Sequence, residues 1–194
     1  MFSRSLGDGA ELRLLEERYA PDLYALIDAN RVRLRRWFAW LDGTTTPDAT
    51  LAYIRDANRQ LADNRGYRAA IFLDTPDGWR LTGTAGMHPV NWQDRSTELA
   101  YWVGGQFEGR GLATRACRAL CAHAFDAMRL HRVEIKVATG NERSHAVPRR
   151  LGFRAEGVAR QAEWLYDHHE DLTIYAMLAD EWRDAPDRAP RPAP

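Results

Sequence analysis

Two glycines, Gly109 and Gly111, stand between an extended apolar run and a long amphipathic segment, and this junction constrains the fold more than any other stretch. The run before it, residues 97–103 (TELAYWV), is rich in aromatic and β-favouring residues and predicts a strand. Apolar residues recur at three- and four-residue spacing over 112–128, which predicts a helix with one buried face. The chain therefore passes from a strand through a glycine turn directly into a helix.

The rest of the chain carries further strand and helix patterns in mixed order, without an internal repeat, and this order predicts a mixed α/β domain over residues 1–182. Four prolines among the last nine residues predict a disordered Pro/Arg-rich tail at 183–194. The other predicted strands are 11–17, 67–73, 79–88, 131–138, 153–166 and 171–179, with an acidic, histidine-bearing turn at 167–171 (DHHED) before the last of them. The other predicted helices are 21–30, 31–41, one that begins after Thr46, and a short one within 139–153.

Charge and composition exclude several classes of function. The 27 basic residues balance 27 acidic ones, so net charge gives no reason to expect nucleic acid or a membrane as partner. No apolar run reaches eighteen residues and no signal peptide is recognisable, so we expect a soluble cytoplasmic protein. Cys117 and Cys121 lie four residues apart on the apolar helix face, which predicts buried, reduced thiols in preference to a disulfide or a catalytic pair.

The glycine turn has the form of an anion site, because the first N–H groups of a helix lack intrahelical partners and glycine lets an anion approach the backbone. The alternative is a plain corner between strand and helix. A Walker loop is excluded, since no Gly-Lys-Ser/Thr triplet follows the glycines. A dinucleotide fingerprint fits poorly, because Thr114 occupies the third small-residue position and the turn lies in mid-chain.

Residues 106–113 (QFEGRGLA) resemble the Gln/Arg-x-x-Gly-x-Gly/Ala acyl-CoA motif of the GCN5-related N-acetyltransferases, the GNAT superfamily. The resemblance extends over residues 10 to 179. Four stretches are similar, more narrowly, to the branch that acetylates the N-termini of ribosomal proteins. They are WFAWLD, TELAYWVGGQFEGRGLATRA, NERSHAVPRRLGF and EGVARQAEWLYDHHEDLTIYAML.

This resemblance implies a single twisted mixed sheet of about seven strands, with helices on both faces. It also implies that the strands at 97–103 and 131–138 splay apart and hold acetyl-CoA in the gap. The pantetheine arm would then pair with the backbone of Tyr101, Trp102 and Val103. The remaining cofactor-binding residues implied by the motif are Gln106, Gly109, Arg110, Gly111, Leu112 and Ala113 around the pyrophosphate, and Asn141 and Ser144 along the pantetheine arm.

Two residues receive catalytic roles from the resemblance. Glu163 matches the carboxylate that acts as general base toward the amine, directly or through water, and its alternative is a solvated glutamate on a strand. Ser144 matches the serine that protonates or hydrogen-bonds the CoA sulfur, and for Ser144 and Asn141 the alternative is helix capping. Pro148 has no N–H for the carbonyl of Ser144, which predicts a loosened or kinked helical turn.

The early aromatic residues and the paired histidines leave alternatives open. Trp37, Phe38 and Trp40 lie where the family's first helices cover the acceptor, so they are candidates for substrate binding, with core packing as the alternative. His168 and His169 are adjacent in a predicted turn and rarely converge on one ion there, so no metal is expected.

The predicted function is acetyl-CoA-dependent N-acetylation of a primary amine, with the N-terminal α-amine of a protein such as a ribosomal protein as the acceptor. A small-molecule, antibiotic or toxin amine, or a lysine, is the alternative acceptor, because the fold does not fix it. A non-catalytic CoA-binding module is the second alternative. The expected partners are acetyl-CoA and the acceptor, without nucleic acid or membrane, and a homodimer stays open as the assembly.

Overall fold

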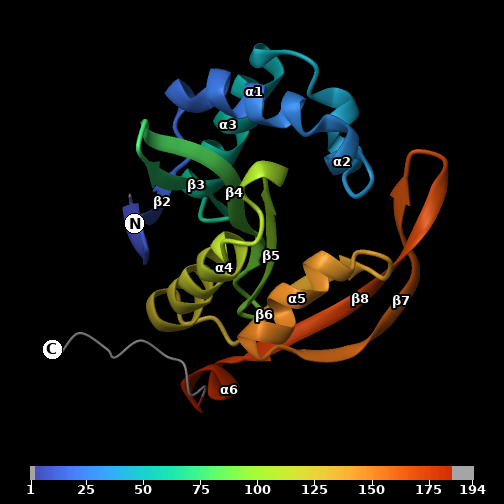
Figure 1. Ribbon diagram of the computed structural model, residues 1–194. Helices are drawn as coiled ribbons and strands as arrows, with labels where there is room; N and C mark the ends of the chain where they lie inside the picture. The colour runs from blue at the N-terminus through green and yellow to red at the C-terminus, as the bar shows by residue number, and fades with distance from the viewer. Residues whose placement is uncertain (1–2, 185–194) are drawn as a thin grey trace, which may run out of the picture.

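The computed structural model describes residues 3–184, and its eight strands form one sheet in the order β1-β2-β3-β4-β5-β6-β8-β7 (Figure 1). The strands are β1 (Ser3–Gly7), β2 (Ala10–Leu14), β3 (Tyr67–Thr75), β4 (Gly78–Asn91), β5 (Ser96–Val103), β6 (Arg132–Ala138), β7 (Arg154–Leu165) and β8 (His168–Leu178). Only β5 and β6 run parallel, and every other neighbouring pair is antiparallel. The mixed α/β prediction is confirmed. The extra strand is β1, whose five residues include none that is buried and so carry no apolar pattern.

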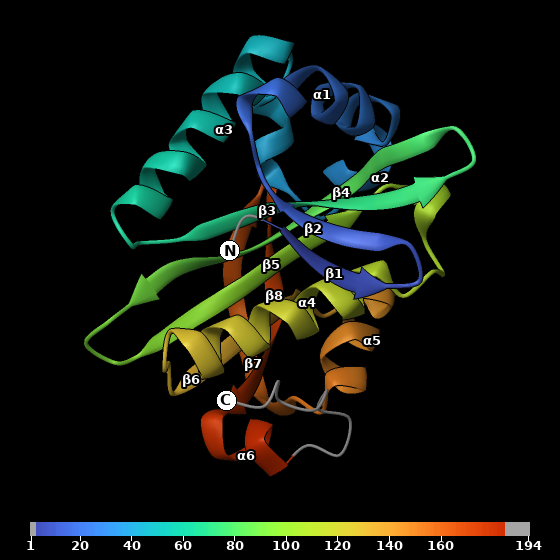
Figure 2. The same ribbon diagram turned by 90° about the vertical axis from the view of Figure 1, so that its left-hand side faces the viewer.

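Helices cover both faces of the sheet, as predicted (Figure 2). The helices are α1 (Ala20–Ala29), α2 (Arg31–Arg35), α3 (Pro47–Ala62), α4 (Leu112–Ala122), α5 (Glu142–Leu151) and α6 (Ala179–Asp184). In Figure 2, α1 and α3 lie on one side of the sheet, and α4 and α5 lie on the other. Each side has its own buried cluster, because the side chains of a strand alternate between the two faces.

Strand β5 shows this alternation at the centre of the sheet. Leu99 and Tyr101 pack with the cluster under α4, whereas Trp102 packs with the cluster under α1 and α3. Successive residues of one strand therefore face the two different helical layers.

The segment predicted as one helix over 112–128 is α4 followed by a π-helical turn at His123–Ala127. Both cysteines of α4 are buried and free, which confirms the prediction of reduced thiols. Burial raises the pKa of the Cys117 and Cys121 thiols, so neither is a ready nucleophile.

The helix predicted over 31–41 is interrupted. Helix α2 ends at Arg35, Phe38 has an extended backbone, and a 3-10 turn spans Ala39–Gly43. Helix α3 then begins as predicted, with Thr46 as its N-cap: the Thr46 hydroxyl accepts a hydrogen bond from the N–H of Ala49 at 3.1 Å.

The C-terminal strands form a long hairpin whose turn is shorter than predicted. Only Tyr166 and Asp167 lie between β7 and β8, so four of the five residues of DHHED belong to β8. Polar side chains mark a solvent-facing edge hairpin here, not a loop. Arg183 and Asp184, the first two residues of the predicted tail, are part of helix α6. The rest of that tail lies outside the described residues. Within residues 3–184, no helix is long and apolar enough to span a membrane.

Candidate active site

Strands β5 and β6 separate after three residue pairs. They pair only from Ser96–Glu98 to Arg132–Glu134, while β5 stays paired with β4 as far as Val103 and β6 stays paired with β8 as far as Ala138. The β5 backbone beyond Glu98 is therefore an unpaired inner edge. This confirms the predicted splay. Tyr101, Trp102 and Val103 lie on the part of β5 that has no strand partner on the β6 side.

The glycine turn leads from this edge to α4. Gly109 and Gly111 both have positive φ, 76° and 68°, a conformation that favours glycine. Gly111 is the N-cap of α4 and provides no capping side chain, so the first N–H groups of the helix point outward without a side-chain acceptor. A Cβ at Gly109 would have no atom within 4 Å, and one at Gly111 would meet only Arg115, at 4.0 Å. The turn thus has open space over a helix N-terminus, which fits a phosphate group.

Other residues of the predicted phosphate loop fall into two groups. Gln106 and Arg110 are exposed beside the glycines, whereas Leu112 is buried in the core and Ala113 is half-buried. Leu112 and Ala113 can therefore contribute backbone N–H groups but not side chains. The Arg115 guanidinium holds the turn against β1, because it donates to the carbonyls of Arg110 at 3.1 Å and Gly7 at 2.5 Å.

Two residues at the junction of α1 and α2 hold the turn from the other side, and neither was predicted. The buried Asn30 accepts a hydrogen bond from the N–H of Gly105 at 2.7 Å and donates one to the carbonyl of Leu26 at 2.8 Å. Arg33 donates to the carbonyl of Val103 at 2.5 Å and pairs with Glu108. A polar asparagine at the end of an apolar helix was the only sequence signal for this tether.

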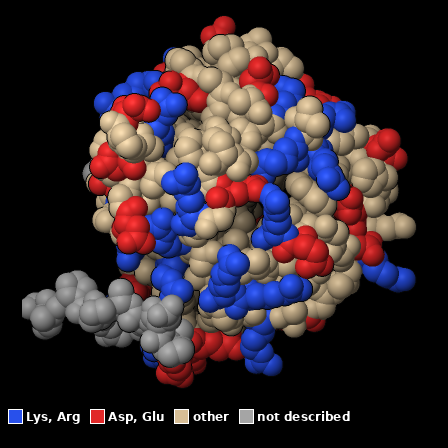
Figure 3. Space-filling view, viewed as in Figure 1, with Lys and Arg blue, Asp and Glu red and all other residues tan. Residues whose placement is uncertain are grey.

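Several basic side chains, with acidic ones between them, border a hollow on the face that includes α4, α5 and the end of α2 (Figure 3). Arg33 and Arg143 come from α2 and α5 respectively, and both pair with the carboxylate of Glu108 in the glycine turn. The surroundings of the turn are therefore cationic, as a polyanionic ligand requires.

Helix α5 brings Asn141 and Ser144 to the splay. Asn141 is the N-cap and accepts from the N–H of Ser144 at 3.3 Å, so the capping interpretation holds for Asn141. Helix α5 continues through Pro148, where the sequence predicts a loosened or kinked turn. The Tyr101 hydroxyl explains this, because it donates to the carbonyl of Ser144 at 3.0 Å, in place of the missing N–H.

Glu163 lies on β7 opposite Glu170 of β8. Glu163 is exposed on the strand, but desolvation by the groups around it, and then the negative charges of Glu98 and Glu170, raise the pKa of Glu163. The Glu98 carboxylate is itself paired with Lys136, at 2.7 Å. Among the residues the structure describes, the charged neighbours that act on Glu163 are these carboxylates, a setting that favours proton uptake.

The tip of the β7–β8 hairpin is joined to the segment after α2. Tyr166 donates its hydroxyl hydrogen bond to the carbonyl of Phe38 at 2.5 Å, and the Arg35 guanidinium lies 3.8 Å from the centre of the Tyr166 ring. Trp37 lies against the β6–α5 loop, since a Cβ at Gly140 would be 3.8 Å from its ring. The predicted acceptor-side residue Trp37 is therefore next to the cofactor candidate Asn141.

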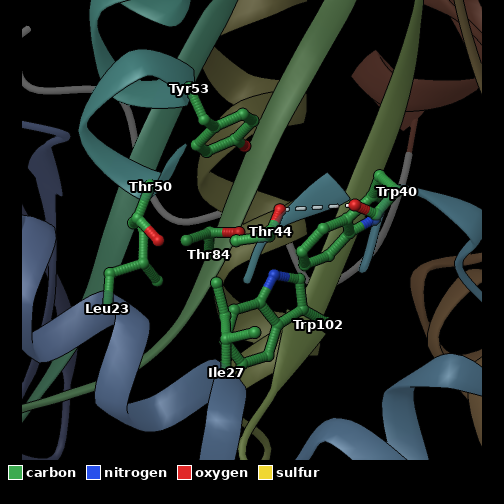
Figure 4. Close-up of a pocket in the computed structure, with 8 residues that line it drawn as sticks. All are labelled: Leu23, Ile27, Trp40, Thr44, Thr50, Tyr53, Thr84 and Trp102. Atoms are coloured by element: carbon green, nitrogen blue, oxygen red, sulfur yellow. Dashed lines mark hydrogen bonds between the residues drawn. The ribbon is translucent and has the colours of Figure 1, made fainter. Parts of the chain in front are cut away.

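Trp40 is exposed at 41% and borders a small cavity between the helices and the sheet (Figure 4). The cavity is lined by Leu23, Ile27, Trp40, Thr44, Thr50, Tyr53, Thr84 and Trp102. Its volume of about 20 Å³ has room for roughly one water molecule and not for a cofactor arm. In Figure 4 the Trp40 ring points toward the cavity from the side opposite Thr50, and a hydrogen bond joins the Trp40 carbonyl to Thr44.

His168 and His169 are successive residues of β8, so their side chains point to opposite faces. His168 contacts Asp167 at 2.7 Å and Glu170 at 3.2 Å, while the His169 ring meets the Trp164 ring edge-on. Among the residues the structure describes, no group of three or more His, Cys, Asp or Glu side chains could hold a metal ion.

A strand pair that opens over an uncapped, glycine-flanked helix N-terminus is the arrangement that the resemblance to acyl-CoA-dependent transferases implies, and sequence comparison agrees. Residues 10–154 match the family model for the acetyltransferase (GNAT) domain. The chain belongs to the GNAT family and is an N-acetyltransferase, as predicted.

Two relatives and one solved structure are similar to this chain over nearly its whole length. The chain is 37% identical to the putative ribosomal N-acetyltransferase YdaF of Bacillus subtilis, over 94% of this chain and 98% of that one. It is 27% identical to the ribosomal-protein-serine acetyltransferase of Escherichia coli, over 90% and 96% of the two chains. Its fold matches the microcin C7 self-immunity acetyltransferase MccE, solved with acetyl-CoA and AMP, with a TM-score of 0.84, 25% identity, and coverage of 89% and 94%.

Proposed function

We propose that this enzyme transfers the acetyl group of acetyl-CoA to the N-terminal α-amine of a protein, such as a ribosomal protein, by direct attack in a ternary complex. The names of the relatives that span nearly the whole chain support this acceptor. The observation that carries the proposal is Glu163, a carboxylate with a raised pKa next to Glu98 and Glu170.

Acetyl-CoA supplies the acetyl group as a thioester. We assign its pyrophosphate to the turn between Gln106 and Ala113, because Gly109 and Gly111 leave open space over the N-terminus of α4. The unpaired edge of β5 then offers the backbone of residues 101–103 to the amides of the pantetheine arm. Asn141 caps α5 beside this edge and is assigned to the same arm.

Glu163 is the proposed general base. An α-ammonium group has a pKa near 8, so a carboxylate acting directly or through water can remove its proton near neutral pH. The raised pKa of Glu163 makes its carboxylate a stronger base than an ordinary glutamate. The nearby carboxylates of Glu98 and Glu170 also favour the approach of a cationic amine.

Ser144 is the proposed hydrogen-bond donor to the sulfur that leaves the acetyl group. Its hydroxyl is half-buried in the first turn of α5, on the side that meets β5 through Tyr101. Negative charge develops on this sulfur as the thioester breaks, and a fixed donor stabilises it. Trp37 and Trp40, from the segment that the β7–β8 hairpin contacts, are assigned to the acceptor side.

The test uses acetyl-CoA with a pair of synthetic peptides, one with a free N-terminal serine and one with that amine blocked and a lysine left free. Mass spectrometry should show acetylation of the free peptide alone. Glu163→Gln should lower turnover sharply at neutral pH and less at high pH, where the amine is already neutral. Glu142→Gln, an exposed carboxylate at the start of α5, is the control. Equal acetylation of the blocked peptide would overturn the N-terminal assignment.

A small-molecule amine is the second candidate acceptor. The fold match to MccE, an immunity acetyltransferase solved with AMP, is the observation that favours it. A screen of amino-acid conjugates and antibiotic amines with the same mass-spectrometric readout separates the two acceptors. A non-catalytic CoA-binding module would release no CoA thiol with any amine.

A further inference from the structure

The Tyr101 hydroxyl lies between two oxygens of one residue. It is 3.0 Å from the backbone carbonyl of Ser144 and 3.0 Å from the Ser144 hydroxyl. Tyr101 comes from the unpaired part of β5 and Ser144 from the first turn of α5, so this contact joins the two walls of the splay. The sequence resemblance used only the backbone of Tyr101.

Pro148 explains why the carbonyl of Ser144 is available. In a regular α-helix this carbonyl accepts from the N–H four residues later, and proline has none. The Tyr101 hydroxyl replaces that donor. The same hydroxyl is also within hydrogen-bond distance of the Ser144 side chain. The proline leaves the Ser144 carbonyl open and the tyrosine binds it, so the two residues together fix the position of Ser144.

We propose that Tyr101 is a positioning residue for acetyl transfer, whose hydroxyl holds the Ser144 hydroxyl toward the sulfur of acetyl-CoA. This inference rests on the proposed role of Ser144. When the serine donates its hydrogen bond to the sulfur, its oxygen is free to accept from Tyr101, whose single O–H proton is then shared between the carbonyl and the hydroxyl of Ser144 as a three-centre hydrogen bond. The charged sulfur is a stronger acceptor than a neutral hydroxyl, so charge development favours this arrangement.

No proton leaves Tyr101 in this arrangement. Burial, and then the neighbouring Cys117, raise the pKa of Tyr101 far above that of a free tyrosine. The hydroxyl therefore stays neutral and acts only as a hydrogen-bond donor. The amine proton leaves through the base on the acceptor side, so the tyrosine–serine pair stabilises charge without changing the proton balance.

Three variants of the full-length enzyme test the role: Tyr101→Phe, Ser144→Ala and the double variant. Tyr101→Phe should lower kcat on the order of ten- to a hundredfold, less than the roughly hundred- to thousandfold for loss of a direct donor to developing charge, because the tyrosine acts through the serine; the Kd for CoA should change little. The double variant should be no slower than Ser144→Ala, because the tyrosine acts through the serine. If the fold-loss in kcat of the double variant equals the product of the two single losses, the inference is overturned. A Tyr101→Phe enzyme whose kcat stays within about twofold of wild type would also overturn it.

Two further variants separate positioning from folding. Pro148→Ala in the Tyr101→Phe background restores an N–H for the carbonyl of Ser144. It should recover thermal stability and leave kcat low; recovery of kcat would reduce Tyr101 to a structural role. Tyr175→Phe is the matched control, since it removes another buried tyrosine hydroxyl, one bonded to His145 at 2.9 Å, and should keep kcat within about twofold.

Failure of the proposed function gives a different pattern. Wild-type enzyme that acetylates no amine contradicts the function itself. An active wild type with a fully active Ser144→Ala variant removes the serine's role, and the inference about Tyr101 with it, but leaves the acetyltransferase assignment intact.

Discussion

Asn30 and Gly105 are 75 residues apart in sequence, and the side-chain oxygen of Asn30 accepts the backbone N–H of Gly105 at 2.7 Å. This bond ties the N-terminal helices to the start of the glycine turn. The asparagine is only 7% exposed, and its amide nitrogen is also satisfied, by the carbonyl of Leu26. The position of the turn thus depends on a side chain from outside the strand–turn–helix motif.

Asn30→Ala should therefore weaken both the fold and the cofactor site. It leaves the N–H of Gly105 and the carbonyl of Leu26 without their partner, at a cost of about 1–3 kcal/mol in the free energy of unfolding. Calorimetry should also show a higher Kd for CoA. Asn30→Asp keeps the acceptor for Gly105 and should bind CoA more tightly than Asn30→Ala; equal values for the two variants would contradict this account.

Gly111 allows a matched pair of variants at the predicted phosphate site. Asparagine tolerates positive φ better than most residues, and aspartate has the same shape with a negative charge. Gly111→Asp should therefore bind CoA more weakly than Gly111→Asn, by on the order of tenfold if the pyrophosphate lies within a few ångströms. The two variants should have similar melting temperatures. Identical affinities would mean that the anion binds elsewhere.

Glu163→Gln should stabilise the protein at neutral pH. Because the folded-state pKa of Glu163 is raised, the folded protein binds the proton more tightly than the unfolded chain does, and stability falls as pH rises through the window above 4.5. Glutamine removes this loss. Urea midpoints of variant and wild type should differ at pH 7 and converge at low pH, where Glu163 is neutral. A variant less stable than wild type at pH 7 would contradict a raised pKa for Glu163 in the folded protein.

His88 should contribute acid sensitivity. Burial, and then the Arg68 guanidinium, lower the pKa of His88 to about 4. The unfolded chain then binds more protons below about pH 6.5, so stability is lost as pH falls from 6.5 toward 4. His88→Gln should reduce this slope in urea titrations. Burial also lowers the pKa of His123, so part of the slope should remain.

The sequence predicted the parts of the fold that local patterns encode. The glycine turn, helix α4 and the β3–β4 hairpin were found because apolar spacing and glycine positions are local signals. Strand β1 and helix α6 were missed because five and six residues are too few for a clear period. The error at 167–171 came from reading polar residues as a turn, whereas the outer strands of this hairpin are solvent-facing.

The site was predicted less completely than the fold, since its key contacts join residues far apart in sequence. Asn30, Arg33 and the hydroxyl of Tyr101 act through such contacts, which no periodicity reveals. The donor that replaces the missing N–H of Pro148 comes from strand β5, so no local pattern could show how helix α5 continues past the proline. The resemblance to a family identified residues by position, and the structure added how Tyr101 and Ser144 meet.

The ion pair between Lys136 and Glu98 has a consequence for the enzyme's own chemical durability. Of 27 basic residues Lys136 is the only lysine, and all the others are arginines, whose guanidinium groups stay protonated and are poor nucleophiles. The hydrogen bond to Glu98 raises the pKa of Lys136, so this amine also stays charged at neutral pH. An enzyme that binds reactive thioesters therefore has no neutral side-chain amine that they could acetylate. The positive charges of its own side chains are kept, whereas acetylation removes the charge of the substrate amine.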